Sequence, residues 1–356
     1  RYPTGINTPS LINPNLTWEK STTKNLGFDF TFLQSRLTFT ADIFERKVTD
    51  ILIPGGKDYP ALIGDDDLPF ENAGILKTTG FELQAKWSDK LANGFRYSVG
   101  VALSDDKAKV VSYPSNPTNK IGDGVLYKGY TVGDIWGYVT GGILQEGDFD
   151  GVGANGKPLY HGPYFKGGQA YPGYIWYQDL DHDGVITTGL NTVDDPGDRK
   201  VIGNNAPLYR YNITANFQYK GFDLDLMFQG VGKRDYWLSS TSSYWGNGAG
   251  SWEVYNNSWT PERTDAKFPM YGSGTGSYPQ TGYLLDASYI KLKQVILGYT
   301  FPRALINKIG LEKLRLNLAA YNLFTISDMP KYYDADYLSD AYPPKRTFSV
   351  GIQVGF

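Results

Sequence analysis

The sequence predicts an all-β fold, a segment of a transmembrane antiparallel up-and-down β-barrel with long extracellular loops. Three observations predict it. Apolar and polar residues alternate at period two over nine segments, the connections between these segments alternate between short and long, and no segment approaches the roughly 20 apolar residues of a membrane helix. Bacterial barrels join strands that face lipid on one side and a lumen on the other by short periplasmic turns and long extracellular loops.

The final segment, residues 346–356, shows the alternation in its strictest form. From Thr347 onward, five apolar side chains fall on one side of an extended chain, and small or polar residues fall on the other. A strand of about 9 to 11 residues, apolar outward and polar inward, is the unit of a membrane β-barrel. For this segment alone, an edge strand of a soluble sandwich fits equally well. The rest of the chain decides between them.

Four strands are predicted in the N-terminal part, because apolar residues recur there at every second position. A tight turn at Gln34 and Ser35 joins the first two strands, and residues 88–95 join the next two. A loop at residues 51–75, with a Gly-Gly pair and an acidic run, separates the two hairpins. The four strands cover residues 18–33, 36–51, 81–87 and 96–104.

Five more strands follow a long excursion at residues 109–207, which is dense in Gly, Asp, Tyr and Pro. Lys220 and Gly221 form the turn of the next hairpin. Further on, Lys291 and Lys293 come before a regular apolar alternation, so we predict a β-bulge in this strand. The five strands cover residues 209–219, 222–229, 289–301, 314–320 and 346–356.

The connections alternate in length without exception, which a soluble Greek-key sandwich has no reason to do. If Phe356 is periplasmic, every long loop lies outside the cell, and the protein belongs in the outer membrane of a Gram-negative bacterium. The short turns are residues 33–36, 88–95, 220–221 and 301–311; the long loops are residues 51–75, 109–207, 230–285 and 327–345.

The polar side of the strands carries charges of both signs, which suits a wet lumen or a plug contact. Aromatic residues near the strand ends fit an interfacial girdle. The predicted lumenal charges are Asp29, Asp42, Glu82, Lys86, Arg96, Arg210, Asp223, Asp225 and Arg315. The predicted girdle residues are Tyr209, Tyr219, Phe222, Phe301 and Phe356.

Composition excludes some classes of function. The chain of 356 residues has a net charge of -3 and no Cys, so it offers no basic field for nucleic acid and few catalytic arrangements. It begins at Arg1 without a signal sequence, and we expect it to be the C-terminal part of something longer.

Nine motifs stand in a fixed order along the chain. They are NPNLTWEKSTTKNLGFDF (13–30), ENAGILKTTGFEL (71–83), TVGDIWGYVTGGILQ (131–145), YQDLDHDGVI (177–186), GDRKVIGN (197–204), YKGFDLDLMFQG (219–230), WTPERTDAKFP (259–269), DASYIKLKQVILGYTFP (286–302) and NLF (322–324). In this order and spacing they resemble landmarks of the SusC/RagA-type TonB-dependent outer-membrane transporters.

The resemblance implies that residues 1–356 are the C-terminal portion of one 22-stranded receptor barrel that imports oligosaccharides or oligopeptides, with energy from TonB and a SusD-like lipoprotein as its lid. The family's N-terminal extension, plug and TonB-contacting segment have no counterpart here, and nine strands cannot close that barrel. We therefore expect an N-terminal plug and barrel portion as partner, in the same or a separate chain. The family's terminal aromatic residue resembles an assembly signal, which implies that role for Phe356.

The sequence DLDHDGVI supplies most of a calcium-binding loop. Asp179, Asp181 and Asp183 stand at alternate positions, glycine permits the sharp turn, and Val185 offers its carbonyl. The twelfth position is Leu190 rather than Glu, so a later acid must close the shell. The candidates are Asp194, Asp195 and Asp198, and the ion, Ca²⁺ or Mg²⁺, would be structural. A solvated acidic turn without metal is the alternative.

Two long loops are rich in aromatic residues, which stack on sugar rings or peptide side chains and hydrogen-bond through their polar tips. We predict contact with substrate or lid; packing between loops is the alternative for each residue. The candidates are Tyr236, Trp237, Tyr244, Trp245, Trp252, Tyr255, Trp259, Tyr332, Tyr333 and Tyr337.

Other motifs and classes carry less weight. The segment GVGANGKP resembles a phosphate-binding loop, but Pro158 stands where Ser or Thr is required. We predict no enzyme. An outer-membrane barrel enzyme would need a converged set of acids, Ser and His on the outer loops, and the sequence indicates no such set. The remaining alternative is a soluble or surface calcium-stabilised β-protein with adhesion or lectin-like binding.

Overall fold

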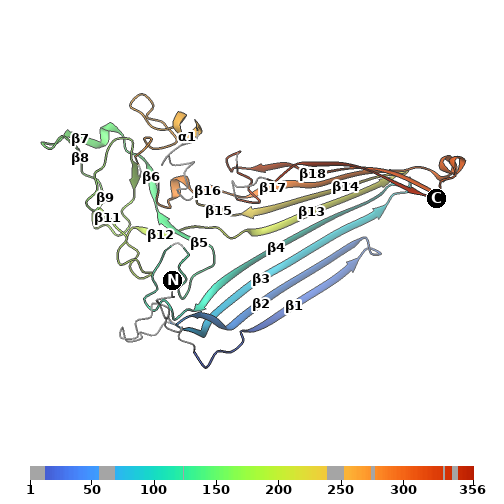
Figure 1. Cartoon of the computed structure of the whole chain (residues 1–356), viewed down its shortest axis with the longest axis horizontal. Coiled ribbons are helices and arrows are strands. Elements are labelled where there is room, and N and C mark those ends of the chain that lie inside the picture. The colour runs from blue at the N-terminus through green and yellow to red at the C-terminus, as the bar shows by residue number, and fades with distance from the viewer. Residues whose placement is uncertain are drawn as a thin grey trace, which may run out of the picture.

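The computed structural model describes residues 13–55, 69–122, 124–238, 252–273, 277–331, 333–338 and 344–356. Its main feature is a nine-stranded antiparallel sheet in the order β1-β2-β3-β4-β13-β14-β17-β18-β19 (Figure 1). The all-β fold and the nine predicted strands are therefore confirmed. The strands are β1 (Lys20–Phe32), β2 (Leu37–Pro54), β3 (Phe70–Lys90), β4 (Arg96–Ser112), β13 (Leu208–Tyr219), β14 (Phe222–Lys233), β17 (Tyr289–Thr300), β18 (Lys313–Ser327) and β19 (Thr347–Gly355).

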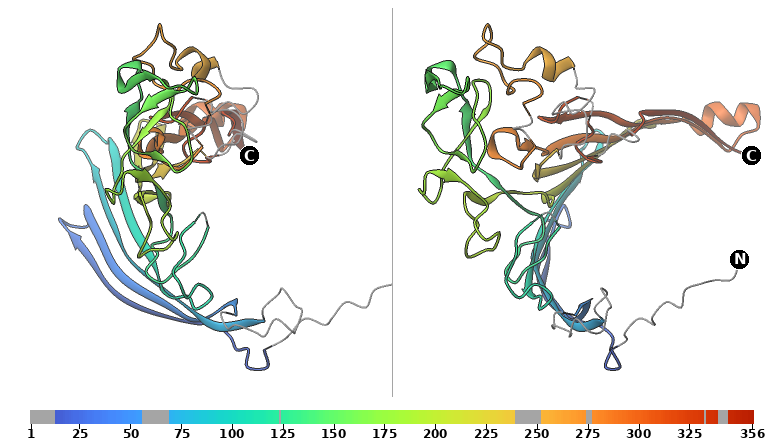
Figure 2. Two further views of the ribbon diagram at one scale, coloured as in Figure 1. Left: turned by 90° about the vertical axis from the view of Figure 1, so that its left-hand side faces the viewer. Right: turned by 60° about the vertical axis from the view of Figure 1, so that its left-hand side comes forward.

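The sheet is curved along its width, as Figure 2 shows, and it forms part of a cylinder wall. The short turns lie at one end of the strands together with the C-terminus, and the long connections gather at the other end (Figure 1). Neighbouring strands are also neighbours in the sequence except where the long excursions intervene. The predicted separation of short and long connections is thus present in space.

The short turns are built from residues with positive φ. Lys220 (φ 47°) and Gly221 (φ 88°) form the two-residue connection between β13 and β14, where both central positions must be left-handed to match the strand twist. Leu33, Gln34 and Ser35 all have positive φ in the predicted turn between β1 and β2.

The apolar side of the sheet is exposed rather than buried. Phe28 keeps 50% and Ile352 keeps 67% of its surface accessible. Ile213, Phe217 and Leu224 are only partly buried, so no protein interior covers this face. An uncovered apolar face of this extent needs hydrocarbon around it, which favours the barrel over a soluble β-protein. No helix among the described residues is long and apolar enough to span a membrane.

The predicted bulge lies at Lys293. The ladder between β14 and β17 passes from Met227–Gln294 to Phe228–Leu292, so Lys293 has no residue opposite it. The extra residue reverses the alternation. Tyr289, Lys291 and Lys293 can therefore face the lumen, while the lower half of the strand turns its apolar residues outward.

Four strands, β3, β4, β14 and β18, are longer than predicted by four residues or more. The alternation in the sequence covers residues 81–87, whereas β3 covers Phe70–Lys90. Residues 70–80 pair with β2 although apolar residues do not recur there at every second position. Such strand extensions lie beyond the apolar belt, where neither face needs to be hydrophobic, and so the period-two signal disappears.

The long connections contain small sheets and short helices. The first excursion holds four two-stranded sheets: β5 (Asp134–Tyr138) with β12 (Arg199–Asn204), β6 (Thr140–Ile143) with β10 (Ile175–Tyr177), β7 (Phe149–Val152) with β8 (Pro158–Tyr160), and β9 (Tyr164–Phe165) with β11 (Val185–Ile186). The second holds β15 (Asp235–Tyr236), α1 (Trp252–Asn256) and β16 (Leu285–Asp286), and the short turn after β17 holds α2 (Arg303–Ile306). The 3₁₀ helices are η2 (Glu146–Asp148), η3 (Thr281–Tyr283) and η4 (Asn307–Ile309).

Much of the hydrophobic core lies in these connections. Tyr138, Ile175, Tyr177 and Ile186 form one buried cluster, and Leu238, Val254 and Phe268 form another. The buried residues come from both long excursions, so the two excursions pack into one body above the loop end of the sheet (Figure 1).

Candidate functional site

The concave face of the sheet carries a cavity of about 550 Å³ near its loop end. Asp42, Glu82 and Arg210, three of the predicted lumenal charges, line it. A second hollow of about 650 Å³ lies toward the short turns and is lined by Arg96, Asp223, Asp225 and Arg315, four further predicted lumenal charges. Seven of the nine predicted lumenal charges therefore line these two hollows.

Polar contacts between strands fix the side chains of this face. Arg210 of β13 forms an ion pair with Asp106 of β4, and Arg315 of β18 forms one with Asp223 of β14. The hydroxyl of Thr40 donates a hydrogen bond to Asp29 Oδ1 at 2.7 Å. These contacts satisfy charges of both signs in place and leave a mixed polar wall rather than a field of one sign.

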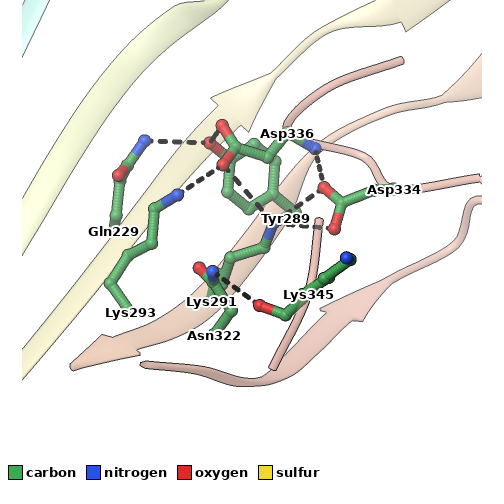
Figure 3. A network of polar contacts seen from close by, with 8 residues as sticks. All are labelled: Gln229, Tyr289, Lys291, Lys293, Asn322, Asp334, Asp336 and Lys345. Atoms are coloured by element: carbon green, nitrogen blue, oxygen red, sulfur yellow. Dashed lines mark hydrogen bonds and ion pairs between the residues drawn. The ribbon is translucent and has the colours of Figure 1, made fainter. Parts of the chain in front are cut away.

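The best-defined cluster joins the upper end of β17 to the strap, which we define as residues 333–338 of the last long connection. The buried Lys291, 1% exposed, donates through Nζ to both carboxylate oxygens of Asp334 at 2.7 and 2.8 Å (Figure 3). Lys293 Nζ lies 2.7 Å from Asp336 Oδ2, and Lys291 Nζ lies 3.4 Å from the same atom. Tyr289 donates its hydroxyl to Asp336 Oδ1 at 2.6 Å. Two lysines and two aspartates are thus neutralised together.

The strap also has an apolar contact with the wall. Ala335, between the two aspartates, is 1% exposed and belongs to a buried cluster with Val231, Ala287, Tyr289 and Met329. The strap is therefore held by a buried methyl group flanked by charge-assisted hydrogen bonds. Through Asp336 it forms one side of the cavity of about 550 Å³ near the loop end of the sheet.

The network shifts the pKa of Asp336. Partial burial alone would raise this pKa, but the hydrogen bonds from Lys293 and Tyr289 and the charges of the two lysines outweigh it and lower the pKa to about 2. Asp336 is accordingly a carboxylate at all physiological pH values.

Sequence reasoning missed this cluster. In the sequence the two lysines indicate only a change of phase in their strand, and the Asp-Ala-Asp sequence of the strap matches no motif. The two lysines and the two aspartates together could have predicted the cluster. Buried lysines need carboxylate partners, and the loop that follows offers two aspartates with the same spacing of two residues.

The aspartate loop brings together part of the predicted metal site. Carboxylate oxygens of Asp179, Asp181 and Asp198 all lie within 4.8 Å of one another. Asp179 accepts hydrogen bonds from the backbone N–H groups of His182 (2.7 Å) and Gly184 (2.8 Å), which shapes the turn. This all-oxygen donor set fits a hard cation such as Ca²⁺.

Asp198, among the later acids considered, is the one that reaches the cluster. It is fully buried, and its two oxygens accept hydrogen bonds from the N–H groups of Leu180 and Thr187, each at 2.7 Å. Asp183 and Asp194 are not part of the group, and Val185 lies in β11. The backbone N–H of Val185 donates to Asp183 Oδ1 at 2.8 Å.

The predicted aromatic contacts fall into three groups. Trp259 is buried at 4% exposure and donates its indole N–H to Gln145 Oε1 at 2.9 Å, which links the two excursions. Tyr236 and Tyr333 pack against the buried clusters, and Trp237 is partly buried. Trp252, Tyr255 and Tyr337 are exposed. Tyr244, Trp245 and Tyr332 lie outside the described residues.

Two further features of the sequence have clear positions. The segment that resembles a phosphate-binding loop is the turn between β7 and β8, and no helix follows it, so it lacks the required framework. Phe356 follows β19 with 88% of its surface exposed; its role as an assembly signal stays a prediction.

The comparisons with known proteins agree with this architecture. Residues 1–323 match the family model described as "TonB dependent receptor-like, beta-barrel". The chain is 28% identical to TonB-dependent receptor P3 of Formosa agariphila, over 99% of the chain and 36% of that receptor. It is 27% identical to TonB-dependent receptor SusC of Bacteroides thetaiotaomicron, over 98% of the chain and 33% of SusC.

Among solved structures, the chain is similar to that of the RagAB peptide transporter, with a TM-score of 0.72 and 20% identity over 99% of the chain and 37% of the matched chain. The RagAB peptide importer in its "open-open" state gives the same TM-score with 22% identity, over 97% and 35% of the two chains. These likenesses show the fold. The chain spans about a third of the length of the curated relatives it matches.

The match over residues 1–323 also shows that the chain is of a transporter family rather than an enzyme family, one whose barrels lie in the outer membrane of Gram-negative bacteria. The chain belongs to the TonB-dependent receptor-like β-barrel family and corresponds to the C-terminal barrel part of SusC/RagA-like receptors.

Proposed function

We propose that residues 1–356 form one segment of the barrel wall of a TonB-dependent nutrient importer that takes up oligosaccharides or oligopeptides. Membership of the receptor family supports transport. Oligosaccharides and oligopeptides both carry many hydrogen-bonding groups. The cavity lined by Glu82, Arg210 and Asp336 offers positively and negatively charged side chains that can bind such groups. This lumenal cavity below a body of folded loops is the observation that carries the proposal.

The proposal includes partners and orientation. An N-terminal plug and barrel portion would complete the cylinder and contact TonB, and a SusD-like lipoprotein would cover the loops. A similar solved structure is named the RagAB peptide transporter, and this name supports oligopeptide import here. The long connections would be extracellular and the short turns periplasmic, because barrels of this class have long loops outside.

The aromatic residues of the loops would contact the ligand or the lid. Trp252, Tyr255 and Tyr337 are the described candidates whose rings are exposed. Alanine at Trp252 and Tyr255 should weaken ligand or lid binding by about tenfold, because each exposed ring supplies a large contact area.

Uptake of labelled oligosaccharides and oligopeptides tests the proposal, in cells that carry the whole receptor as wild type, with Glu82→Gln or with Arg210→Ala. Either change should slow uptake of one ligand class at an unchanged amount of receptor in the outer membrane, and loss of TonB should abolish it. Lys308→Gln, in the short turn after β17 at the opposite end of the sheet, is the control. Uptake that persists without the receptor or without TonB would contradict the proposal.

We further propose that Asp179, Asp181 and Asp198 bind a structural Ca²⁺. The ion would fix the 177–198 segment, whose own backbone already donates to Asp179 and Asp198. Because Asp181 is exposed, Asp181→Asn should keep the fold and lower Ca²⁺ affinity by about tenfold or more, since one charged ligand is lost.

Protease protection of this segment in calcium or chelator measures the effect. Calcium should protect wild-type protein and the control Asp150→Asn, whose carboxylate lies in β7, but should protect Asp181→Asn only at higher concentration. Protection in chelator that equals protection in calcium, in all three proteins, would show that the segment holds its shape without metal.

A further inference from the structure

The register of β1 to β4 places a group of lysines on the outward face of the barrel wall. In one row across the sheet Lys24 pairs with Glu45, Glu45 with Thr79, and Thr79 with Lys107. In the next row toward the loops, Thr22, Lys47, Lys77 and Lys109 stand opposite one another in the same way. We call Lys24, Lys47, Lys77, Lys107 and Lys109 the lysine patch.

Alternation assigns the patch to the lipid side of the sheet. Lys24 lies two residues from Leu26, and Lys47 lies four residues from Ile43, so each shares a face with an exposed apolar residue. The lumenal positions of the same strands include Asp106, which pairs with the inward Arg210. The patch therefore borders the apolar belt directly, on its loop side.

The patch carries little compensating charge. Lys77 forms an ion pair with Glu45 at 2.7 Å, and the charges of Lys24 and Lys47 also act on that carboxylate. Within the part of the chain that the structure describes, no carboxylate lies at ion-pair distance from Lys24, Lys47, Lys107 or Lys109. Asp105, also at an outward position, is buried and accepts a hydrogen bond from the N–H of Tyr209.

This arrangement costs stability unless an anion is present. Lys47, Lys77 and Lys109 are directly opposite one another across three strands, where like charges repel. The chain as a whole has a net charge of -3, so the concentration of positive charge is local. A row of ammonium groups just above a lipid-facing apolar surface matches an amphiphile with anionic groups in its head and acyl chains below.

We propose that the lysine patch is a binding surface for a phosphorylated glycolipid of the outer leaflet. The phosphates would lie over Lys47, Lys77 and Lys109, and the acyl chains would lie along the exposed side chains of Leu26 and Ile43. The surface is separate from the lumen, so it does not depend on the transported ligand.

Lipid binding to the full-length receptor in detergent micelles tests the proposal. The probes are a bisphosphorylated lipid A, the same lipid without its phosphates, and inorganic phosphate. The triple variant Lys47→Gln/Lys77→Gln/Lys109→Gln should bind the phosphorylated lipid roughly a hundredfold more weakly than wild type. Each of the three lysines should contribute a similar part of the binding free energy to an anionic surface. Removing the phosphates from the lipid should weaken wild-type binding to the same extent.

The matched control is Lys90→Gln/Lys220→Gln/Lys313→Gln, which removes three exposed lysines at the short-turn end and should bind like wild type. Retained heat-modifiable mobility shows that both triple variants are folded, and the glutamines at the patch relieve repulsion rather than create it. Equal affinity for lipid with and without phosphates, unchanged affinity of the patch variant, or full competition by inorganic phosphate would each overturn the proposal. A patch variant that binds the phosphorylated lipid as wild type does but no longer binds a protein partner would also overturn the proposal.

Discussion

At the scale of single residues, the most constrained groups are those that bury charge. Lys291 is 1% exposed and depends on Asp334 and Asp336 for every strong contact of its ammonium group. A buried charge that loses its partner is far more costly than an exposed one, because nothing replaces its hydration. The docking of the strap therefore depends on a few atoms.

Asp334→Asn should release the strap from the wall. The substitution removes the negative charge and one of the two oxygens that accept from the buried ammonium of Lys291, and the remaining carboxylate, Asp336, lies 3.4 Å away, so docking should weaken by about 3 kcal/mol. Amide hydrogen exchange of the strap in the folded receptor measures the change. Lys331→Gln, an exposed neighbour, should leave exchange as in wild type. Slow exchange that persists in Asp334→Asn would show that the apolar contact of Ala335 is sufficient.

Strap docking should also respond to acid. The pKa of Asp336 is lowered from 3.8 to about 2, so its ion pairs add their full stability above about pH 4. This contribution, about 2 kcal/mol, is lost as the pH falls from about 4 to about 2, because the carboxylate then takes up a proton. Cleavage of the strap by pepsin should therefore increase over this range in wild type, and much less in Asp336→Asn. Equal acid dependence in both proteins would assign the effect to other groups.

At the scale of elements, the sequence predicted the parts of the strands that contact the hydrocarbon of the bilayer. A strand that faces lipid must alternate where hydrocarbon touches it, so β1, β13 and β19 could be located within a few residues. The bulge of β17 could be predicted as well, because lumenal lysines and outward apolar residues in one strand require a change of phase. The upper part of β3 could not, since its polar residues pair where neither face needs to be apolar.

The phase of β17 should be essential. Inserting one alanine between Leu292 and Lys293 adds a second extra residue, so Tyr289 and Lys291 would turn toward lipid while the lower half of the strand keeps its orientation. We expect the receptor to lose folded, heat-modifiable barrel from the outer membrane. Lys293→Gln keeps the residue count and should assemble normally, with only the ion pair to Asp336 lost. Normal assembly of the insertion variant would show that the register of β17 is free to slip.

At the scale of the whole molecule, the sheet and the loop body follow different physical rules. The sheet exposes its apolar residues, whereas the loop body buries residues such as Tyr177, Phe268 and Ala287 in an interior of its own. For the loop body, the sequence predicted only long irregular connections. Its core is assembled from short segments far apart in the chain, so no local pattern indicates it. The metal cluster shows the same limit: the loop motif was local, but the choice of Asp198 depended on the fold.

Assembly of the barrel should depend on the end of β19. Phe356 follows this strand with its ring exposed, which suits recognition by an assembly factor better than packing. Phe356→Ala should reduce the amount of receptor at the cell surface several-fold, measured by surface labelling against total protein. Leu305→Ala, another exposed apolar residue near the short turns, is the control. Equal surface labelling of the two variants would argue against the assembly role.

The two borders of the nine-stranded sheet have a consequence of their own. Among the described residues, β1 pairs only with β2, and β19 pairs only with β18, so each presents a rank of backbone groups without a neighbour. In hydrocarbon such groups cost several kcal/mol each, and in water they recruit any available strand. A sample of these residues by themselves would therefore join border to border into ladders and precipitate, however well each molecule had folded.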